Sequence, residues 1–127
     1  TMYSFDAFIF GTTSSPSDAY TFAKGGTIQH PAGFEMKLDV PLDFYGVSDH
    51  AFYLGVLREM ANPDSEISKH EIAEGMSALG DSNDRGSKFS RILSFIRSAR
   101  ASEINDPNIV QSAWDDTIES ANTDKEP

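Results

Sequence analysis

The sequence contains no cysteine in its 127 residues. This absence excludes disulfide bonds, thiolate metal sites and a cysteine nucleophile. No apolar run approaches the ~20 residues that a membrane-spanning helix needs, so we expect no membrane partner. The chain also lacks the basic region and apolar stretch of a signal peptide. We therefore expect a cytoplasmic protein, with Met2 as its native start and Thr1 as a cloning remnant.

Basic residues are scarce: ten Lys and Arg stand against twenty Asp and Glu, for a net charge of −10. A surface this acidic repels nucleic acid and anionic membranes and attracts basic partners. The acidity has two interpretations. It keeps the protein soluble, or it forms a surface that binds a basic protein or imitates a phosphate backbone.

Apolar residues, by contrast, are plentiful, at 39% of the sequence with 11% aromatic, which is enough to build one core. At roughly 100–200 residues per domain, the length predicts a single domain. We expect residues 1–127 to form it, with a β-rich part over 1–46, a helical part over 47–120 and a frayed tail over 121–127.

The first part is predicted to form a small antiparallel sheet of three to four strands over residues 2–40, packed against helices that follow. Its segments alternate apolar and polar residues with period two, and the first is rich in aromatics. Gly25-Gly26 predicts a hairpin turn, because glycine adopts positive φ angles at little cost. The expected strands cover residues 2–10, 20–22, 27–29 and 34–40.

From Ser48 onward, apolar residues recur with helical spacing, which predicts three to four helices and an α+β fold. Ser68 and Glu71 have the spacing of a capping box, in which each side chain satisfies a free backbone donor at a helix start. Asn105-Asp106-Pro107 is typical of another helix start, since the missing N–H of proline costs little there. The expected helices cover about 48–61, 68–79, 86–100 and 106–120.

The helical part contains a weak internal repeat. A shift of 37 residues places Phe52 on Phe89 and Ser65-Glu66-Ile67 on Ser102-Glu103-Ile104 without a gap. The layout resembles an EF-hand pair, two helix–loop–helix units whose loops touch through a central apolar residue. The resemblance implies that Ile67 and Ile104 touch, and that the first loop offers oxygen ligands from Asn62, Asp64, Ser68 and Glu71.

The chain departs from the EF-hand pattern in both loops. Met60 stands where the family carries its first Asp, and Ser65 replaces the glycine of the sharp turn. In the second loop Asn108 replaces the closing Glu. A hard dication prefers six or more oxygen ligands, so we expect no metal site.

No local signature of catalysis occurs in the sequence. His30, His50 and His70 lack metal-ligand spacing, and we interpret them as structural or surface residues. Neither a nucleophile motif nor a phosphate-binding loop is present. An acid/base pair could come from Asp6, Asp39, Asp43 and Asp49 only if the fold brought two of them together. The sequence therefore predicts no enzyme and no cofactor.

The sixteen residues from Arg85 to Arg100 hold five basic residues and no acid. At about 100° per residue the cations flank the apolar stripe, and serines cover the back of the helix. A DNA-reading helix would carry its cations on that exposed back. We therefore expect these side chains to lie along the core edge and to pair with acidic neighbours.

The sequence predicts a non-catalytic protein-binding module: a small acidic inhibitor or adaptor, phage-encoded or of the immunity type, whose partner has a basic surface. Three alternatives stay open: an acidic nucleic-acid mimic, a helix-turn-helix DNA-binding regulator, and a degenerate EF-hand-like calcium-responsive domain. Direct binding of nucleic acid is disfavoured by the net charge. The expected partner-binding residues are Glu66, Glu71, Glu74, Asp81, Asp84, Arg91, Arg97, Arg100, Asp115 and Asp116.

Overall fold

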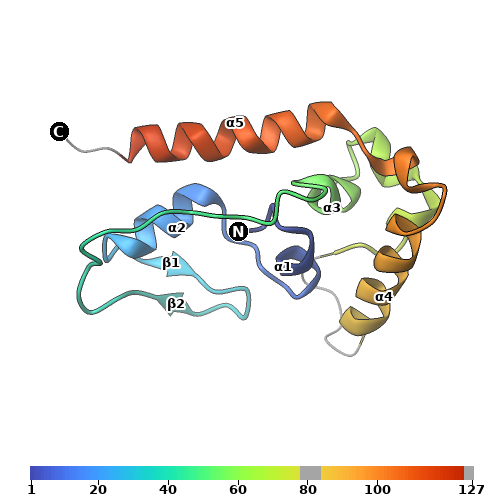
Figure 1. Ribbon diagram of the computed structural model, residues 1–127. Coiled ribbons are helices and arrows are strands. Elements are labelled where there is room, and N and C mark those ends of the chain that lie inside the picture. The colour runs from blue at the N-terminus through green and yellow to red at the C-terminus, as the bar shows by residue number, and fades with distance from the viewer. Residues whose placement is uncertain (78–83, 125–127) are drawn as a thin grey trace.

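A computed structural model describes residues 1–77 and 84–124 of the chain. Within these residues the protein is an α+β domain with five α-helices, short 3-10 helices and one two-stranded antiparallel sheet. The elements are α1 (Phe5–Ile9), α2 (Pro16–Ala23), β1 (Ile28–Gln29), β2 (Glu35–Met36), α3 (Val56–Met60), η1 (Glu66–Lys69), η2 (Glu71–Ala73), α4 (Arg85–Ile96), η4 (Ala101–Ile104) and α5 (Pro107–Thr123). In Figure 1, α5 runs along one side, with the β-hairpin towards one end and α4 at the other.

The sheet is smaller than the sequence predicts. β1 and β2 pair antiparallel, with Ile28 opposite Met36 and Gln29 opposite Glu35. The strands expected at 27–29 and 34–40 are therefore confirmed over two residues each. The strands expected at 2–10 and 20–22 are wrong, because both segments are helical over much of their length.

Helix α1 occupies the segment predicted as the first strand. Phe5, Phe8 and Ile9 have i, i+3, i+4 spacing, so the same apolar run also fits a helix. Phe8 and Ile9 are buried, and α1 packs against both α3 and α4. Tertiary packing, rather than local propensity, decides the conformation of this short segment.

Helix α2 stands where the second strand is predicted, and the glycines of the predicted hairpin turn follow its end. Ser15 Oγ accepts a hydrogen bond from the Asp18 amide at 3.1 Å, and Asp18 Oδ2 accepts one from the Ser15 amide at 2.8 Å. This capping box, with Pro16 at the first helical position, fixes the start of α2. Gly25 has φ +79 and donates to the Phe22 carbonyl, so the glycine ends a helix.

The predicted helices are formed unevenly. The one at 86–100 is confirmed as α4, and the one at 106–120 as α5, which continues to Thr123. The helix at 48–61 is reduced to α3, and the helix at 68–79 is wrong: η1 and η2 stand there, separated by an extended His70. Ser68 Oγ donates to the Ser65 carbonyl at 2.7 Å and caps nothing.

The two proposed repeat units consequently differ. The 17-residue α5 follows η4, whereas only the three residues of η2 follow η1. The EF-hand and helix-turn-helix alternatives both expect a full helix at 68–79, and the described part of that segment, residues 68–77, does not form one. Ile67 and Ile104 nevertheless pack on the same core cluster.

The core lies where α1, α3 and α4 meet. None of residues 24–53 is buried, and within this range only Tyr53 packs against the core cluster, so the hairpin adds nothing to the core. The long connection after the hairpin passes near α2 and α5 (Figure 1). The buried cluster consists of Phe8, Ile9, Val56, Leu57, Met60, Ile72, Ala73, Met76, Ile92 and Ile104.

Helix α5 packs on α2 and α3 and ties the hairpin half to the core half. Lys24 Nζ lies 2.7 Å from a carboxylate oxygen of Asp124, which also accepts a hydrogen bond from the Tyr45 hydroxyl at 3.0 Å. Gly55 lies against Ala113 and has φ +76, so both its backbone and its lack of Cβ are required there. No helix among the described residues is long and apolar enough to cross a membrane.

Candidate functional site

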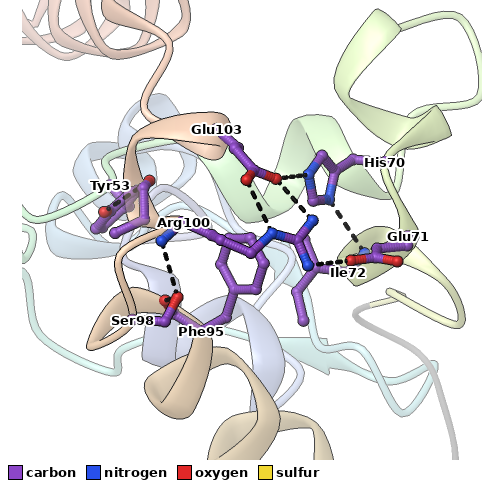
Figure 2. A network of polar contacts seen from close by, with 9 residues as sticks. Tyr53, His70, Glu71, Ile72, Phe95, Ser98, Arg100 and Glu103 are labelled. Carbon is purple, nitrogen blue, oxygen red and sulfur yellow. Dashed lines mark hydrogen bonds and ion pairs between the residues drawn. The ribbon is translucent and has the colours of Figure 1, made fainter.

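Arg100 is the centre of a surface polar network that joins η2 to η4 (Figure 2). Its Nε and Nη2 donate to the two carboxylate oxygens of Glu103, each at 2.8 Å. Its Nη1 donates to Glu71 at 2.5 Å. A two-point pairing of this kind fixes the plane of the guanidinium, so the sequence-predicted residues Glu71 and Arg100 are brought together.

His70 completes the network from the other side. Its Nδ1 accepts a hydrogen bond from the Ile72 amide at 3.2 Å, so in the neutral ring Nε2 carries the proton and donates to Glu103 at 3.1 Å. The ring of Phe95 meets His70 edge-on, and the Arg100 guanidinium carbon lies 5.3 Å from the centre of the same ring. Figure 2 shows the side chains of His70 and Arg100 pointing towards Glu103.

The network shifts the pKa values of Glu103 and Arg100. Hydrogen bonds from Arg100 and then His70 lower the pKa of Glu103 to about 2. Hydrogen bonds to Glu103 and Glu71 raise the pKa of Arg100 above its ordinary value. The charges therefore satisfy one another, and we interpret the network as a clamp between η2 and η4.

Several other predicted site residues are also paired. Glu66 forms an ion pair with Lys69 at 2.5 Å, and Asp84 one with the largely buried Lys88 at 3.4 Å. Pairing of the basic helix with acidic neighbours is thus confirmed for Lys88 and Arg100. Arg91 instead donates to the main-chain carbonyl of Glu74 at 2.5 Å.

The remaining predicted site residues are dispersed. Asp115 accepts a hydrogen bond from Gln111 on the exposed side of α5, and Asp116 accepts one from Tyr3. Arg97 is exposed, with no ion pair among residues 1–77 and 84–124. Asp81 lies outside the described residues. The ten predicted residues therefore form no single surface cluster within the part of the chain that is described.

Two of the four aspartates considered for acid/base chemistry do converge. Asp6 Oδ1 lies 3.0 Å from His50 Nδ1, and Asp49 Oδ1 accepts a hydrogen bond from Ser4 Oγ at 2.6 Å. The same Ser4 oxygen accepts a hydrogen bond from the His50 backbone amide at 2.9 Å. The Ser4 hydroxyl therefore donates to Asp49 and contacts only the backbone of His50, so Ser4 and the imidazole do not form a nucleophile–base pair.

Asp49 is held in its charged form. Burial alone would raise the pKa of this carboxyl, but hydrogen bonds from the N-terminal amino group, Ser4 and Thr1 lower it below its ordinary value. The Thr1 hydroxyl donates to Asp49 at 2.7 Å. Within the described residues, no group of three or more His, Cys, Asp or Glu side chains could hold a metal ion.

Val40, Leu42 and Phe44, which we call the apolar edge, are the most unusual surface feature. Their exposed fractions are 73%, 51% and 90%. Sequence analysis missed this surface because it ended the alternating pattern at Pro41. The alternation of apolar with polar or proline residues in fact continues to Phe44, which was the available signal.

Helix α5 exposes a second, smaller apolar pair. Trp114 and Ile118 are 51% and 42% exposed, and their i, i+4 spacing places them on one helix face. The helical spacing of apolar residues in the helix expected at 106–120 includes Trp114, which would predict a buried position for it. Ala113 and Ser120 are buried instead, because α2 and α3 cover that side of α5.

A family model matches the whole chain. All of residues 1–127 fit the family described as "Protein of unknown function (DUF3604)". The chain belongs to the DUF3604 family. No curated protein and no solved structure matches the chain. A functional assignment for this DUF3604 chain must therefore be argued from its own geometry.

Proposed function

We propose that this DUF3604 chain is a protein-binding module whose partner covers the apolar edge. The exposure of Val40, Leu42 and Phe44 supports this proposal. Exposed apolar side chains that stand together on a surface mark interaction sites more often than isolated ones do. Large apolar side chains such as Phe44 also supply much of the binding free energy at interfaces when a partner covers them.

The charge around the apolar edge indicates the chemistry of the partner. Asp39 and Asp43 alternate with the three apolar residues and are exposed, and no basic residue occurs between them. The whole chain carries a net charge of −10. A partner surface with apolar pockets and a rim of Lys or Arg would complement this pattern.

The backbone of the same segment also favours a binding role. Residues 37–55 contain no helix or strand, and their contacts include a hydrogen bond from the Leu42 amide to the Ala23 carbonyl at 2.9 Å. An irregular connection on the surface can adjust to a partner more easily than a helix can.

The nucleic-acid mimic has less support. Such a mimic needs rows of unpaired carboxylates that stand in for phosphates. Glu71 and Glu103 are neutralised in part by Arg100, and Glu66 by Lys69. These pairings remove several acids of the helical half from any phosphate-like row.

The proposal is tested by site-specific photo-cross-linking in the native host, with a photoreactive residue at Phe44 or, as control, at the exposed Arg97. We expect a discrete cross-linked partner from position 44 and none from position 97. The captured protein is then purified and titrated against the full chain. Phe44→Ser should weaken its binding by about 30-fold, the usual effect of losing a central interface residue.

Three results would overturn the proposal. One is the absence of any cross-link at position 44. Another is a partner that binds Phe44→Ser as tightly as the unchanged chain. The third is a cross-link from position 44 to another residue of the same chain, which would show that the chain itself covers the apolar edge. A separate double variant, Asp39→Asn with Asp43→Asn, tests the role of charge. It should lower the rate of association with the partner and the salt dependence of that rate, without abolishing binding.

A further inference from the structure

A pocket of about 690 Å³ lies between the β-hairpin and the start of α4. Its walls come from the loop after α1, from the β-hairpin and from Arg85 at the start of α4. Its volume is within the range of small-molecule sites in proteins, roughly 300–1,000 Å³. Within the described residues, the polar network and the apolar edge contribute nothing to this lining.

Hydrogen-bond donors are concentrated in this pocket. Thr12, Thr13 and Ser14 bring three hydroxyl groups to its wall. His30 Nδ1 accepts the Ala32 amide at 3.0 Å, so in the neutral ring Nε2 carries a proton and acts as a donor. No described residue that lines the pocket is acidic. In a chain with twice as many acids as bases, such a lining favours an anionic ligand.

Arg85 supplies the positive charge of the pocket. Its guanidinium lies flat on Gly11, where a Cβ would come within 3.0 Å of Nη2, and Gly11 has φ +103. Nη1 donates to the Phe10 carbonyl at 2.8 Å, which fixes the plane of the group. Among the described residues Arg85 pairs with no carboxylate, and its buried Nε has no hydrogen-bond partner. A buried charged donor without a partner is unfavourable, so the described part of the site lacks an acceptor.

The unused edge of the guanidinium defines the acceptor. Nε and Nη2 are the two atoms through which Arg100 binds the carboxylate of Glu103 in this same chain. A planar carboxylate matches that edge with two parallel hydrogen bonds. One guanidinium balances one negative charge, which favours a carboxylate over a phosphate dianion. Access to Nε requires a small shift of the wall, because Nε is closed to solvent.

Apart from Gln29, the rest of the pocket is apolar. Ile28 and Met36 line it from the two strands, and Phe10, Pro31 and Ala32 complete that side. We propose that the pocket binds a small organic carboxylate with an apolar body, held by Arg85 through its Nε–Nη2 edge. The apolar body lies against the hairpin, and the hydroxyls of Thr12, Thr13 and Ser14 face its polar end.

The test is an NMR titration of the full, ¹⁵N-labelled chain with sodium benzoate, with inorganic phosphate and benzyl alcohol in separate arms. We expect saturable shifts of the Gly11 and Thr12 amides with benzoate and weaker effects in the other two arms. Arg85→Met keeps most of the side-chain stem but removes the charge, and it should weaken benzoate binding by at least about tenfold. Arg97→Met, on the turn after the same helix, is the matched control and should leave the affinity unchanged.

Each contrary outcome overturns the proposal. If phosphate binds more tightly than benzoate, the ligand class is a phosphate and not a carboxylate. If benzyl alcohol binds as tightly as benzoate, the pocket recognises only the apolar body. Arg85→Met with unchanged affinity would remove Arg85 from the site, as would the absence of saturable benzoate binding. Should Arg85→Met lose its fold by circular dichroism, Arg85→Lys serves in its place, because it keeps the charge without the planar fork and should weaken binding to a smaller extent.

Discussion

Tyr3 and Asp116 are 113 positions apart in the sequence and share a hydrogen bond of 2.7 Å, donated by the Tyr3 hydroxyl. The bond joins the first residues of the chain to the middle of α5. Burial, followed by the bond to Asp116, raises the pKa of Tyr3 to about 12. The fold therefore favours the neutral phenol over the phenolate.

This relationship predicts a late tyrosine titration. The folded pKa lies above the ordinary value of 10.0, so the contribution of Tyr3 to stability is present below pH 10 and is lost as the pH rises towards 12. Phenolate absorbance of the unchanged chain minus that of Tyr3→Phe should show a midpoint near 12. Asp116→Asn should lower the midpoint without restoring 10, because burial remains. A difference curve centred near 10 would contradict the assignment.

Removal of Arg100 is predicted to return the pKa of Glu103 towards its ordinary value. The pKa of Glu103 is about 2 and should rise towards its ordinary 4.5 in Arg100→Met, because the largest cause of its shift is lost. Since the folded pKa is depressed, the contribution to stability is present above pH 4.5 and is lost as the pH falls towards 2. Carboxyl-carbon NMR measures the midpoint directly. Arg97→Met should leave the midpoint of Glu103 unchanged. High salt should reduce the difference in midpoint between the unchanged chain and Arg100→Met, because salt screens the ion pair.

Three glycine-to-alanine changes separate backbone strain from steric overlap. Gly46 has open space around it, Gly33 has open space but φ +88, and Gly55 has φ +76 with Ala113 Cβ only 2.8 Å from a new Cβ. We expect Gly46→Ala to change the free energy of unfolding little, and Gly33→Ala to lower it by about 1 kcal/mol. Gly55→Ala should cost more, about 2–4 kcal/mol, since overpacking adds to strain. Urea unfolding, with the m-value unchanged between variants, measures the free energy of unfolding of all three. Any other order of the three losses would contradict this separation of strain from overlap.

The capping box of α2 gives a local stability prediction. Ser15→Ala removes the acceptor of the Asp18 amide and should lower the free energy of unfolding by about 1 kcal/mol. Ser17→Ala, two residues further on and exposed, is the matched control and should cost little. Equal effects of the two changes, measured by thermal unfolding, would show that the cap contributes nothing specific.

The uneven success of sequence reasoning has a physical cause. The long helices at Arg85–Ile96 and Pro107–Thr123 are predicted well, because each repeats its apolar spacing over several turns and α5 has a Pro107 start. The run around Phe5 is too short to separate period two from helical spacing. Ser15-Pro16-Ser17-Asp18 combines a cap, a proline and an acid, which are signals of a helix start rather than of a loop.

The candidate site was harder to predict than the fold. Ion pairs such as Arg100 with Glu71 join residues whose spacing in sequence carries no helical or strand period, so only the folded chain reveals them. Exposure of Trp114 follows from which side of α5 is covered by α2, a choice that the apolar pattern of α5 alone leaves open. Arg85 and Gly11 meet for the same reason: their contact depends on the placement of α1 beside α4.

The packing of α2 on α5 also sets the order of events during synthesis. The ribosome completes α2 at Ala23, but its partner helix begins only at Pro107 and reaches its Lys24 contact at Asp124. Residues 16–46 must therefore wait for most of the described chain before they find their long-range contacts. During that interval the face of α2 that α5 later covers is unshielded in the nascent chain, which makes α2 a natural place for a chaperone to bind.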